Sequence, residues 1–482
     1  MASRIVDRTV LLISHEMVGK HMAGPGIRYY HLATVLARHF NLTLAIPRQP
    51  DPSAAISINK LGFSEFPVVS YVRGSWETIE AHVRQTEIVI LPSDTAADFP
   101  QLAHSDASLV VDGYDPLLPE WLALYGVTES ESGGQHWRQR MHALHHQHRM
   151  GDFFICASER QRDWWLGMLE AHGRINPWTF REDSSLRRLI DVVAYGLPDG
   201  EPTWTRPVLK GIWPGIGPDD KVILWGGGLW LWLDPLTAIR AVAVLWQQRQ
   251  DVRLVFPGTR HPNPLLGDIS SHNQAAKSLA LELGLLDKAI FFGDWVAYED
   301  WANVLLEADV ALSLHFDTVE TRLAFRSRVL EYIWAGLPII ATTGDATGEL
   351  VEHFGLGTVV DYTDTDAVAQ SIGRLLEKPR DALKDAFAEA RRELRWEAVA
   401  QPLIAFCRQP RRAPDRTALG DTIGNPATVD TIHSLAGQVD AQKQVIAHLQ
   451  VRNEQQSRLI RAYEQGKFMR FMRWLSSVRP GV

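Results

Sequence analysis

Short apolar runs alternate with helical patterns along most of this chain of 482 residues, and they do so in two separate blocks. The apolar runs of the first block are Thr9–Ser14, Leu42–Ile46, Ile88–Leu91, Leu109–Asp112 and Phe153–Ala157. Strands that alternate with helices are typical of parallel sheets, because a parallel connection has to cross over one face of the sheet. The first block therefore predicts a doubly wound, Rossmann-like sheet.

The alternation stops at a segment rich in Pro, Gly and Trp, between Gly196 and Pro218, whose composition is typical of a linker. It then resumes, with apolar runs at Lys221–Trp225, Arg253–Phe256, Ala289–Phe292, Val310–Ser313 and Pro338–Thr342. The sequence thus predicts an α/β chain with two Rossmann-like domains, residues 1–205 and residues 206–385. A chain of this length has room for two or three domains.

After these two domains the pattern changes twice. Residues 386–408 are predicted to form charged helices that close the globular body, and a change of composition near Gln409 predicts a linker over residues 409–427. The tail, residues 428–482, is predicted to be helical. Its heptad a and d positions hold Ile432, Leu435, Val439, Ile446, Leu449, Ile460 and Tyr463, with Gln442, Asn453 and Gln456 as the polar members. This pattern predicts a coiled coil that joins residues 428–466 to a second copy or another protein; the alternative is a solvated helix packed on its own body.

The end of the tail, residues 467–479, is basic and amphipathic. As a helix it gathers Phe468, Phe471, Met472 and Leu475 on one face and Arg470 and Arg473 on another. From Gln409 onward the chain has 11 Lys and Arg against 6 Asp and Glu, a local charge of +5, whereas the whole chain has a net charge of -8. Short helices of this kind bind membrane surfaces or partner grooves, so we expect one of these roles; the alternative is a frayed tail with a chance apolar face.

Composition excludes several classes of protein. The acidic net charge argues against a nucleic-acid partner, which requires a basic face. The two cysteines, Cys156 and Cys407, make neither a disulfide framework nor a Cys-based zinc site. No apolar run approaches the ~18 residues of a membrane-spanning helix. We therefore expect a cytoplasmic protein that is at most peripheral on the inner face of the cell membrane.

Three consecutive glycines follow an expected strand of the second domain. Gly226, Gly227 and Gly228 precede a helical run, and glycines at such a turn let backbone N–H groups approach a phosphate at the positive end of the helix. The pattern is equally consistent with a tight turn beneath Trp230 and Trp232.

A second phosphate-binding pattern begins at Arg326. Arg326, Ser327 and Arg328 open a predicted helix that Gly336 ends. Free N–H groups, a hydroxyl and guanidinium groups within one turn form a natural clamp for a diphosphate. Glu331, one turn further on, has a carboxylate that can accept hydrogen bonds from ribose hydroxyl groups.

The stretch from Val310 to Thr342, with its helix, its Ala-Gly-Leu-Pro sequence and its final strand, resembles the signature of retaining GT-B glycosyltransferases of the "group one" family. The resemblance covers most of Thr9 to Leu376. Its supporting motifs are Gly24-Pro25-Gly26-Ile27-Arg28, Ser158-Glu159-Arg160-Gln161, Tyr195-Gly196-Leu197-Pro198 and Gly226–Gly228.

What the resemblance implies is a GT-B fold, in which the two Rossmann-like domains face a cleft and a nucleotide-sugar binds at the helix with Glu331. The donor phosphates then lie between the glycine turn and the first-domain loop with Gly24, Gly26 and Arg28. Membership also implies that the reaction needs no metal ion and no other cofactor.

This chain departs from the family pattern in its acidic and basic residues. Glu331 matches the second position of the family motif Glu-x7-Glu, but the first position holds Leu323, and Glu320 is the nearby substitute. The basic residues that usually follow the glycine turn are absent, so we assign their charge to Arg326, Arg328 or Arg260.

The catalytic side chains expected in the first domain are also altered. The family's His-Asp pair is replaced by Asp112-Gly113-Tyr114-Asp115, and either Asp112 or Asp115 is a candidate to orient the acceptor. His15 follows the first expected strand, where ligands bind in open α/β sheets. The predicted catalytic residues are therefore Glu320, Asp112 and His15.

The sequence thus predicts a retaining, metal-independent glycosyltransferase that moves a sugar from a nucleotide-sugar donor to a bacterial surface polysaccharide or a lipid-linked glycan acceptor. Preorganised hydrogen-bond donors stabilise the leaving diphosphate in such a reaction. Two alternatives stay open. Leu323 and the missing basic residues favour a catalytically silent GT-B scaffold in a glycan-synthesis complex, and a GT-B nucleotide-sugar epimerase would act without an acceptor.

Overall fold

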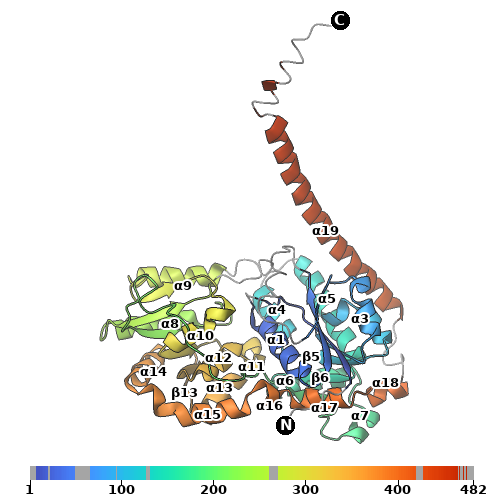
Figure 1. Cartoon of the computed structure of the whole chain (residues 1–482), viewed down its shortest axis with the longest axis horizontal. Coiled ribbons are helices and arrows are strands. Elements are labelled where there is room, and N and C mark those ends of the chain that lie inside the picture. Colours follow the sequence, from blue (N-terminus) through green and yellow to red (C-terminus); the bar gives the residue numbers. More distant parts are fainter. Residues whose placement is uncertain are drawn as a thin grey trace. The chain divides into compact units, whose positions relative to one another are not determined.

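The computed structural model describes residues 7–19, 22–48, 66–93, 95–125, 131–259, 270–419, 427–464, 466, 470–471 and 474. The chain divides into two compact units, the body (Met1–Gly424) and the tail (Asn425–Val482), and each is described by itself (Figure 1).

The N-terminal half of the body is built on a seven-stranded parallel sheet, with the strand order β3-β2-β1-β4-β5-β6-β7. Its strands are β1 (Thr9–Ile13), β2 (Asn41–Pro47), β3 (Val68–Tyr71), β4 (Ile88–Pro92), β5 (Ser108–Asp112), β6 (Phe153–Cys156) and β7 (Ile190–Val192). Its helices are α1 (Gly24–Ala37), α3 (Glu80–Arg84), α4 (Leu117–Tyr125), α5 (Glu131–Met150), α6 (Glu159–Ala171) and α7 (Pro177–Glu182). Short 3-10 turns lie at Trp76–Thr78, Thr95–Ala97 and Pro100–His104.

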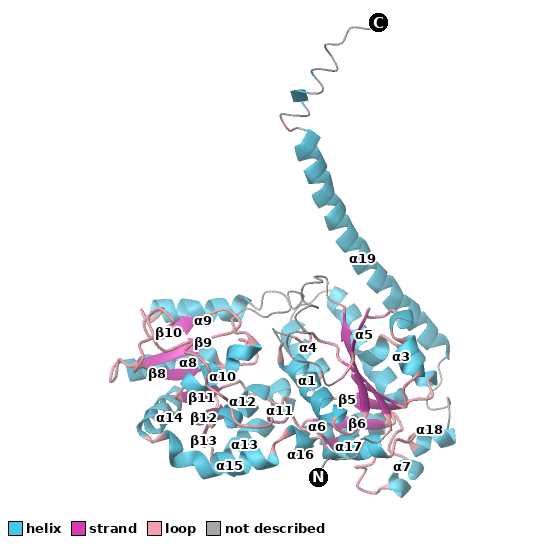
Figure 2. Ribbon diagram, in the orientation of Figure 1, coloured by secondary structure: helices cyan, strands magenta, loops and turns pink. Residues whose placement is uncertain are grey.

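The C-terminal half repeats this plan with a six-stranded parallel sheet, in the order β10-β9-β8-β11-β12-β13. Its strands are β8 (Lys221–Leu224), β9 (Val252–Phe256), β10 (Ile290–Phe292), β11 (Val310–Ser313), β12 (Ile339–Thr342) and β13 (Gly357–Val360). Its helices are α8 (Pro235–Trp246), α9 (Ser270–Glu282), α10 (Tyr298–Glu307), α11 (Val319–Leu323), α12 (Ser327–Ala335), α13 (Ala346–Phe354) and α14 (Thr365–Glu377). Figure 2 shows the strands of both sheets lying between helices.

The buried strands explain why the alternation was so informative. In register, Leu12 of β1 lies between Leu44 of β2 and Ile90 of β4, and all three side chains are buried. Strands that are covered by helices on both faces have near-continuous apolar sequences. The prediction of two Rossmann-like parallel sheets is therefore confirmed.

Two details of the expected elements differ. The sequence shows a helical pattern over Arg28–Phe40. Helix α1 begins earlier, at Gly24, because Pro25 in its first turn has the backbone angle of a helix and needs no N–H partner there. The short strands β3, β7 and β13 were not expected from the sequence.

The chain returns to the N-terminal half after α14. The segment contains a 3-10 turn (Arg380–Leu383) and helices α15 (Lys384–Glu393), α16 (Trp396–Val399), α17 (Gln401–Arg408) and α18 (Pro414–Leu419). The ring of Phe406 stacks on that of Phe153 at 4.8 Å between centroids. Asp415 and Arg174 form an ion pair with both side chains fully buried. The predicted linker over residues 409–427 therefore needs correction, since α18 within it packs on the body through a buried charge.

The tail contains one long helix, α19 (Ala427–Glu464), as expected. Of its heptad residues, Val439, Ile446, Leu449 and Ile460 are between 47% and 58% exposed. The side chains of Ile432, Leu435 and Tyr463 lie outside the described residues, as does most of the basic segment 467–479. No helix in the described ranges is long and apolar enough to cross a membrane.

Candidate functional site

Both sheets change their winding direction beside their first strand. β1 lies between β2 and β4, and β8 lies between β9 and β11. In open α/β sheets, ligands bind outside the carboxyl ends of the strands at such a switch point. A cavity of about 470 Å³ is found there, and residues from both halves of the body line it. His15 and Glu16 follow β1 in its wall, and Gly227 and Gly228 follow β8.

Two helices begin at the wall of this cavity. Gly24 opens α1 and Ser327 opens α12, and both residues line the cavity. A methyl group built on Gly24 would lie only 3.3 Å from Oγ of Ser327, so the two helix ends approach each other closely. The first N–H groups of a helix have no partner within the helix and carry its positive partial charge. Anions are therefore favoured between these two ends.

The glycine turn combines a structural role with exposure to the cavity. The N–H of Gly226 donates a hydrogen bond of 2.7 Å to the hydroxyl of Tyr332, and Gly226 is not part of the wall. Gly227 has a φ of +78°, which only glycine adopts at no cost. Gly227 and Gly228, but not Gly226, are therefore placed to meet a ligand.

The first-domain glycine loop is divided in the same way. Gly24 lines the cavity, whereas a Cβ at Gly26 would lie 2.2 Å from the carbonyl oxygen of Met17, so Gly26 allows close backbone packing.

Arg28, the third residue predicted in that loop, lies away from the cavity together with Asp112. Their side chains are fully buried and joined by two hydrogen bonds, from Nε to Oδ2 at 2.8 Å and from Nη2 to Oδ1 at 3.0 Å. Nη2 of Arg28 also donates to the carbonyl of Val193, and Asp112 accepts from the N–H of Tyr114. The structure thus places these two candidates in a structural ion pair, because their hydrogen-bonding groups are engaged inside the protein.

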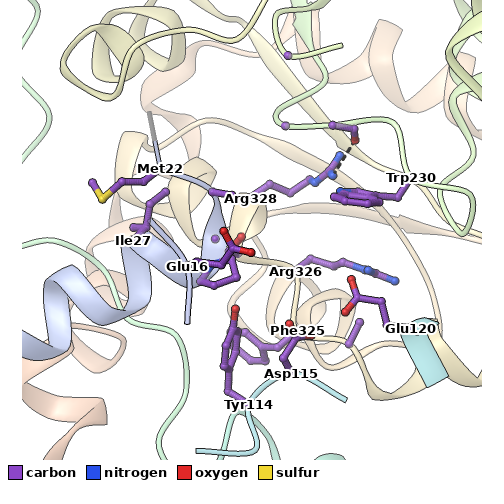
Figure 3. Close-up of a pocket in the computed structure, with 18 of the residues that line it drawn as sticks. Glu16, Met22, Ile27, Tyr114, Asp115, Glu120, Trp230, Phe325, Arg326 and Arg328 are labelled. Carbon is purple, nitrogen blue, oxygen red and sulfur yellow. Dashed lines mark hydrogen bonds between the residues drawn. The ribbon is translucent and has the colours of Figure 1, made fainter. Parts of the chain in front are cut away.

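Arg328 is the cation most available to a ligand. It lines the cavity, its Nη2 donates to the carbonyl of Gly228 at 3.2 Å, and its guanidinium lies 5.6 Å from the ring centroid of Trp225 (Figure 3). Its Nη1 is buried and has no hydrogen-bond partner among the described residues. Burial lowers the pKa of Arg328 to about 10, which leaves it charged at neutral pH. An unpaired buried cation is costly unless an anion completes it.

Arg326 is engaged differently. Its Nη1 and Nη2 donate to the two carboxylate oxygens of Glu320 at 2.9 and 2.8 Å, and both side chains are buried. Glu320 lines the cavity, whereas Leu323, which holds the first position of the family motif, does not. The structure therefore brings Glu320, and not Leu323, to the candidate site.

Glu331 lies one turn into α12 and lines the cavity. Its Oε2 accepts a hydrogen bond of 2.9 Å from the indole N–H of Trp301. Burial raises its pKa to about 7, although the Trp301 hydrogen bond and the charge of Arg328 act in the opposite direction. Trp121, Trp230, Trp232, Trp295 and Trp301 also line the cavity, so flat apolar surfaces adjoin the polar groups.

Sequence reasoning missed two acidic neighbours or left them unassigned. Asp115, which the sequence offered beside Asp112 as a residue to orient the acceptor, lines the cavity. Glu120 of α4 also lines the cavity, although it belongs to no motif of the sequence. His15 also lines the cavity, and Arg260 lies outside the described residues. Within the part of the chain that the structure describes, no three His, Cys, Asp or Glu side chains gather to hold a metal ion.

Comparison with known proteins agrees with this geometry. Residues 214–394 match the model of the family "Glycosyl transferases group 1". The chain is similar to HepE of Anabaena in complex with UDP and glucose, with a TM-score of 0.59 and 14% identity over 83% of this chain and 99% of that one. The C-terminal half thus carries a glycosyl transferases group 1 domain, and the body has the GT-B fold.

Two curated relatives match over shorter stretches. One is the chitobiosyldiphosphodolichol beta-mannosyltransferase of Debaryomyces hansenii, 30% identical over 124 residues, which are 24% of this chain and 26% of that protein. The other is the putative glycosyltransferase YtcC of Bacillus subtilis, 30% identical over 158 residues, which are 32% of this chain and 36% of that protein. The matches thus span only about a quarter to a third of these relatives.

Proposed function

We propose that this protein is a retaining glycosyltransferase that transfers a sugar from a nucleotide-sugar donor without a metal ion. The observation that carries the proposal is the unpaired Nη1 of Arg328 in the wall of a cavity where two helices begin. The group 1 domain supports the same activity. A diphosphate fits this position because it supplies the negative charge and the acceptor oxygens that Arg328 and the helix ends lack.

Each part of the donor then has a partner in the cavity wall. Arg328, Ser327 and the first N–H groups of α12 hold the diphosphate, and Glu331 accepts hydrogen bonds from the ribose. Preorganised donors stabilise the negative charge that develops on the diphosphate when the sugar leaves. The tryptophans exclude water and offer a stacking surface for the base.

Calorimetric titration of the full chain with UDP, GDP and ADP tests the donor site. Wild type is expected to bind at least one of them. Arg328→Ala should weaken that binding roughly 10- to 150-fold, the range for a charged hydrogen bond, and Glu331→Ala should also weaken it. Arg392→Ala, at a side chain 69% exposed on α15, is the matched control and should bind as wild type does. Absence of any nucleotide binding, or unchanged affinity in Arg328→Ala, contradicts the proposal.

A catalytically silent scaffold remains a second candidate, because Leu323 stands at the first motif position, buried and outside the cavity wall. Hydrolysis of the bound donor in the absence of acceptor separates the two functions. An enzyme releases free sugar slowly, and this release should persist in EDTA. A scaffold binds nucleotide and releases none.

For the acceptor we propose a lipid-linked glycan or a growing bacterial surface polysaccharide, at the cytoplasmic face of the membrane. One relative is named for a sugar carried on diphosphodolichol, which supports an acceptor of this class. The half-exposed apolar residues of α19 support self-association through residues 428–466, and the composition of residues 467–479 supports contact with an anionic membrane.

Sedimentation of the full chain and of a shortened chain that ends at Gly424 tests the tail. The shortened chain keeps α18, which packs on the body. It should sediment as a monomer and stay free of anionic vesicles, whereas the full chain should associate and bind them. Identical behaviour of the two proteins contradicts both roles.

A further inference from the structure

Three carboxyl groups lie around Arg326 at one end of the cavity, and a fourth adjoins them. Glu320 receives hydrogen bonds from both terminal nitrogens of Arg326, and Oδ2 of Asp345 lies 3.8 Å from its Nε. Glu120 from the N-terminal half lies near the same guanidinium and is hydrogen-bonded to Asp115 (Figure 3). Asp115, Glu120, Glu320 and Arg326 all line the cavity, so the group is open to a ligand. We call these four residues the acidic subsite.

Acidic groups outnumber the cation in this subsite. Burial raises the pKa of Glu120 well above its usual range, and the charges of Asp115 and Glu320 raise it further. The Asp345 carboxyl also loses water by burial, yet its pKa is lowered, because His315 and Arg326 stabilise its charge. Burial and the neighbouring charges thus favour the neutral form of Glu120. The subsite then offers both a hydroxyl that donates and carboxylate oxygens that accept.

Arg326 itself is incompletely satisfied. It is 8% exposed, and its Nε is buried with no hydrogen-bond partner among the residues that the structure describes. Unsatisfied buried polar atoms are rare and are commonly completed by water or a ligand. Arg326 lines the cavity, so a polar molecule bound there would lie beside this guanidinium.

The position along α12 indicates which part of a donor would lie there. Arg326 immediately precedes the helix, and Glu331 lies one turn inside it. If a diphosphate binds at the first turn and Glu331 holds the ribose, as proposed above, the transferred sugar extends away from Glu331. It then meets Arg326 and the acids around it. This step rests on the proposed function.

We propose that the acidic subsite holds the sugar of the donor, and that it accepts a neutral or amino sugar but rejects a uronic acid. Sugar hydroxyl groups both donate and accept hydrogen bonds, so they match carboxylate oxygens as well as a neutral carboxyl group. A sugar carboxylate would add a further negative charge beside Asp115 and Glu320, where Arg326 is already bound by Glu320. Such like-charge contacts are an effective way to exclude a ligand.

Three other arginines line the cavity, and we assign one of them, Arg328, to the diphosphate of the donor. Arg73 and Arg140 come from the N-terminal half, and Nε of Arg73 donates to Asp98 at 2.9 Å. Arg140 belongs to α5.

Calorimetry with UDP, UDP-glucose and UDP-glucuronic acid on the full chain tests the proposal. Wild type is expected to bind UDP-glucuronic acid at least about tenfold more weakly than UDP-glucose, since adjacent like charges have at least this effect. Glu120→Gln with Asp115→Asn removes negative charge at nearly constant shape, and the ratio should fall to about threefold or less. The affinity of the double variant for UDP should stay within about twofold of wild type, because UDP lacks the transferred sugar that would lie in the subsite. Glu352→Gln, on the exposed face of α13, is the matched control and should keep the full ratio.

The outcomes separate this proposal from the donor site itself. If UDP binds but both sugars bind equally well, or the double variant keeps the wild-type ratio, the acidic subsite does not select the sugar. Asp115→Asn alone serves as the second variant if the double variant melts early, because it removes a negative charge without changing Glu120. If the titrations show binding of GDP and not UDP, GDP-mannose and GDP-mannuronic acid replace the pair. Failure to bind any nucleotide defeats the proposed function, and the subsite with it.

Discussion

The two halves of the body use a buried arginine in opposite ways. Arg28 of α1 in the N-terminal half is enclosed by Asp112 and by the carbonyls of Val193 and Ala194, with its side chain fully buried. Arg328 of α12 in the C-terminal half donates a hydrogen bond to Gly228, and its Nη1 has no partner among the residues that the structure describes. Because a buried guanidinium is stable only when its charge is balanced, the first arginine serves the fold, and the second is the one that we propose for the ligand.

The pKa values of the two arginines show the same contrast. Burial acts to lower both, but Asp112 outweighs it at Arg28, whose pKa is raised. At Arg328 the charges of Glu331 and Glu320 are too weak to outweigh burial, which lowers its pKa to about 10. The difference lies in the neighbours and not in the residue type.

The largest effect is expected at Arg28, the arginine that is paired inside the protein. Asp112→Ala leaves Arg28 buried and uncompensated, so the free energy of unfolding should fall by about 3–5 kcal/mol. Chemical denaturation monitored by far-ultraviolet circular dichroism measures it. The paired variant Arg28→Met with Asp112→Leu removes both charges and should lose much less. Equal losses in the two variants would break the comparison, because the cost would then come from packing alone.

A smaller effect is expected from pH on the affinity for UDP, through Glu331 in the C-terminal half. Glu331 has a pKa of about 7, so it gains its charge between pH 6 and pH 8 and then accepts ribose hydrogen bonds more strongly. UDP affinity should therefore rise over this range, by at most about tenfold. Without nucleotide, the stability of the fold should change with pH in the opposite direction. The neutral Glu331 contributes its full share to the free energy of unfolding below the ordinary pKa of a glutamate, and this share is lost as pH rises through about 7. The pH dependence of UDP affinity in Glu331→Gln measures the contribution of the UDP phosphate alone. If the affinity of wild type rises no more steeply than that of this variant, Glu331 does not bind the ribose.

Arg328→Met tests whether Arg328, unlike Arg28, contributes little to the stability of the fold. The change removes a buried cation that forms no ion pair with the residues that the structure describes, so the free energy of unfolding should stay within about 1 kcal/mol of wild type, or rise. Thermal denaturation without nucleotide measures it. A loss as large as that of Asp112→Ala would show that Arg328 is a structural residue after all.

The smallest effect is expected at an exposed arginine of the same region. Arg322 of α11 pairs with Asp317, and their side chains are 62% and 45% exposed. Surface pairs of this kind contribute little. Arg322→Ala should therefore leave both the melting temperature and UDP affinity unchanged. A marked loss of affinity would mean that positive charge near the cavity acts at a distance, and that the position of Arg328 is not special.

The architecture of the body was largely predictable because it follows from repeated apolar strands. The same signal fails for β7, which has only three residues, and for β3, whose four residues include Ser70. Such short edge segments carry too few apolar positions to show a period. The pairing that defines them comes from neighbours distant in the chain.

The candidate site was predictable where one helix turn contains it. Ser327, Arg328 and Glu331 were found because they are close in sequence, and all line the cavity. Glu120 was missed because it comes from the other half of the body and belongs to no local pattern. The pairing of Arg326 with Glu320 was not visible either, since six residues and a break between α11 and α12 separate them. Which arginine is neutralised depends on tertiary contacts that spacing does not encode.

The return of α16, α17 and α18 to the N-terminal half has a consequence for biosynthesis. The ion-pair partner of Arg174, Asp415, lies 241 residues later in the chain. The ring that stacks on Phe153 belongs to Phe406, which is also made late. During translation the N-terminal half therefore emerges with an uncovered core face and a buried-type arginine that has no counterion. Its folding is completed only after the C-terminal half has been made, so the two halves mature together and not one after the other.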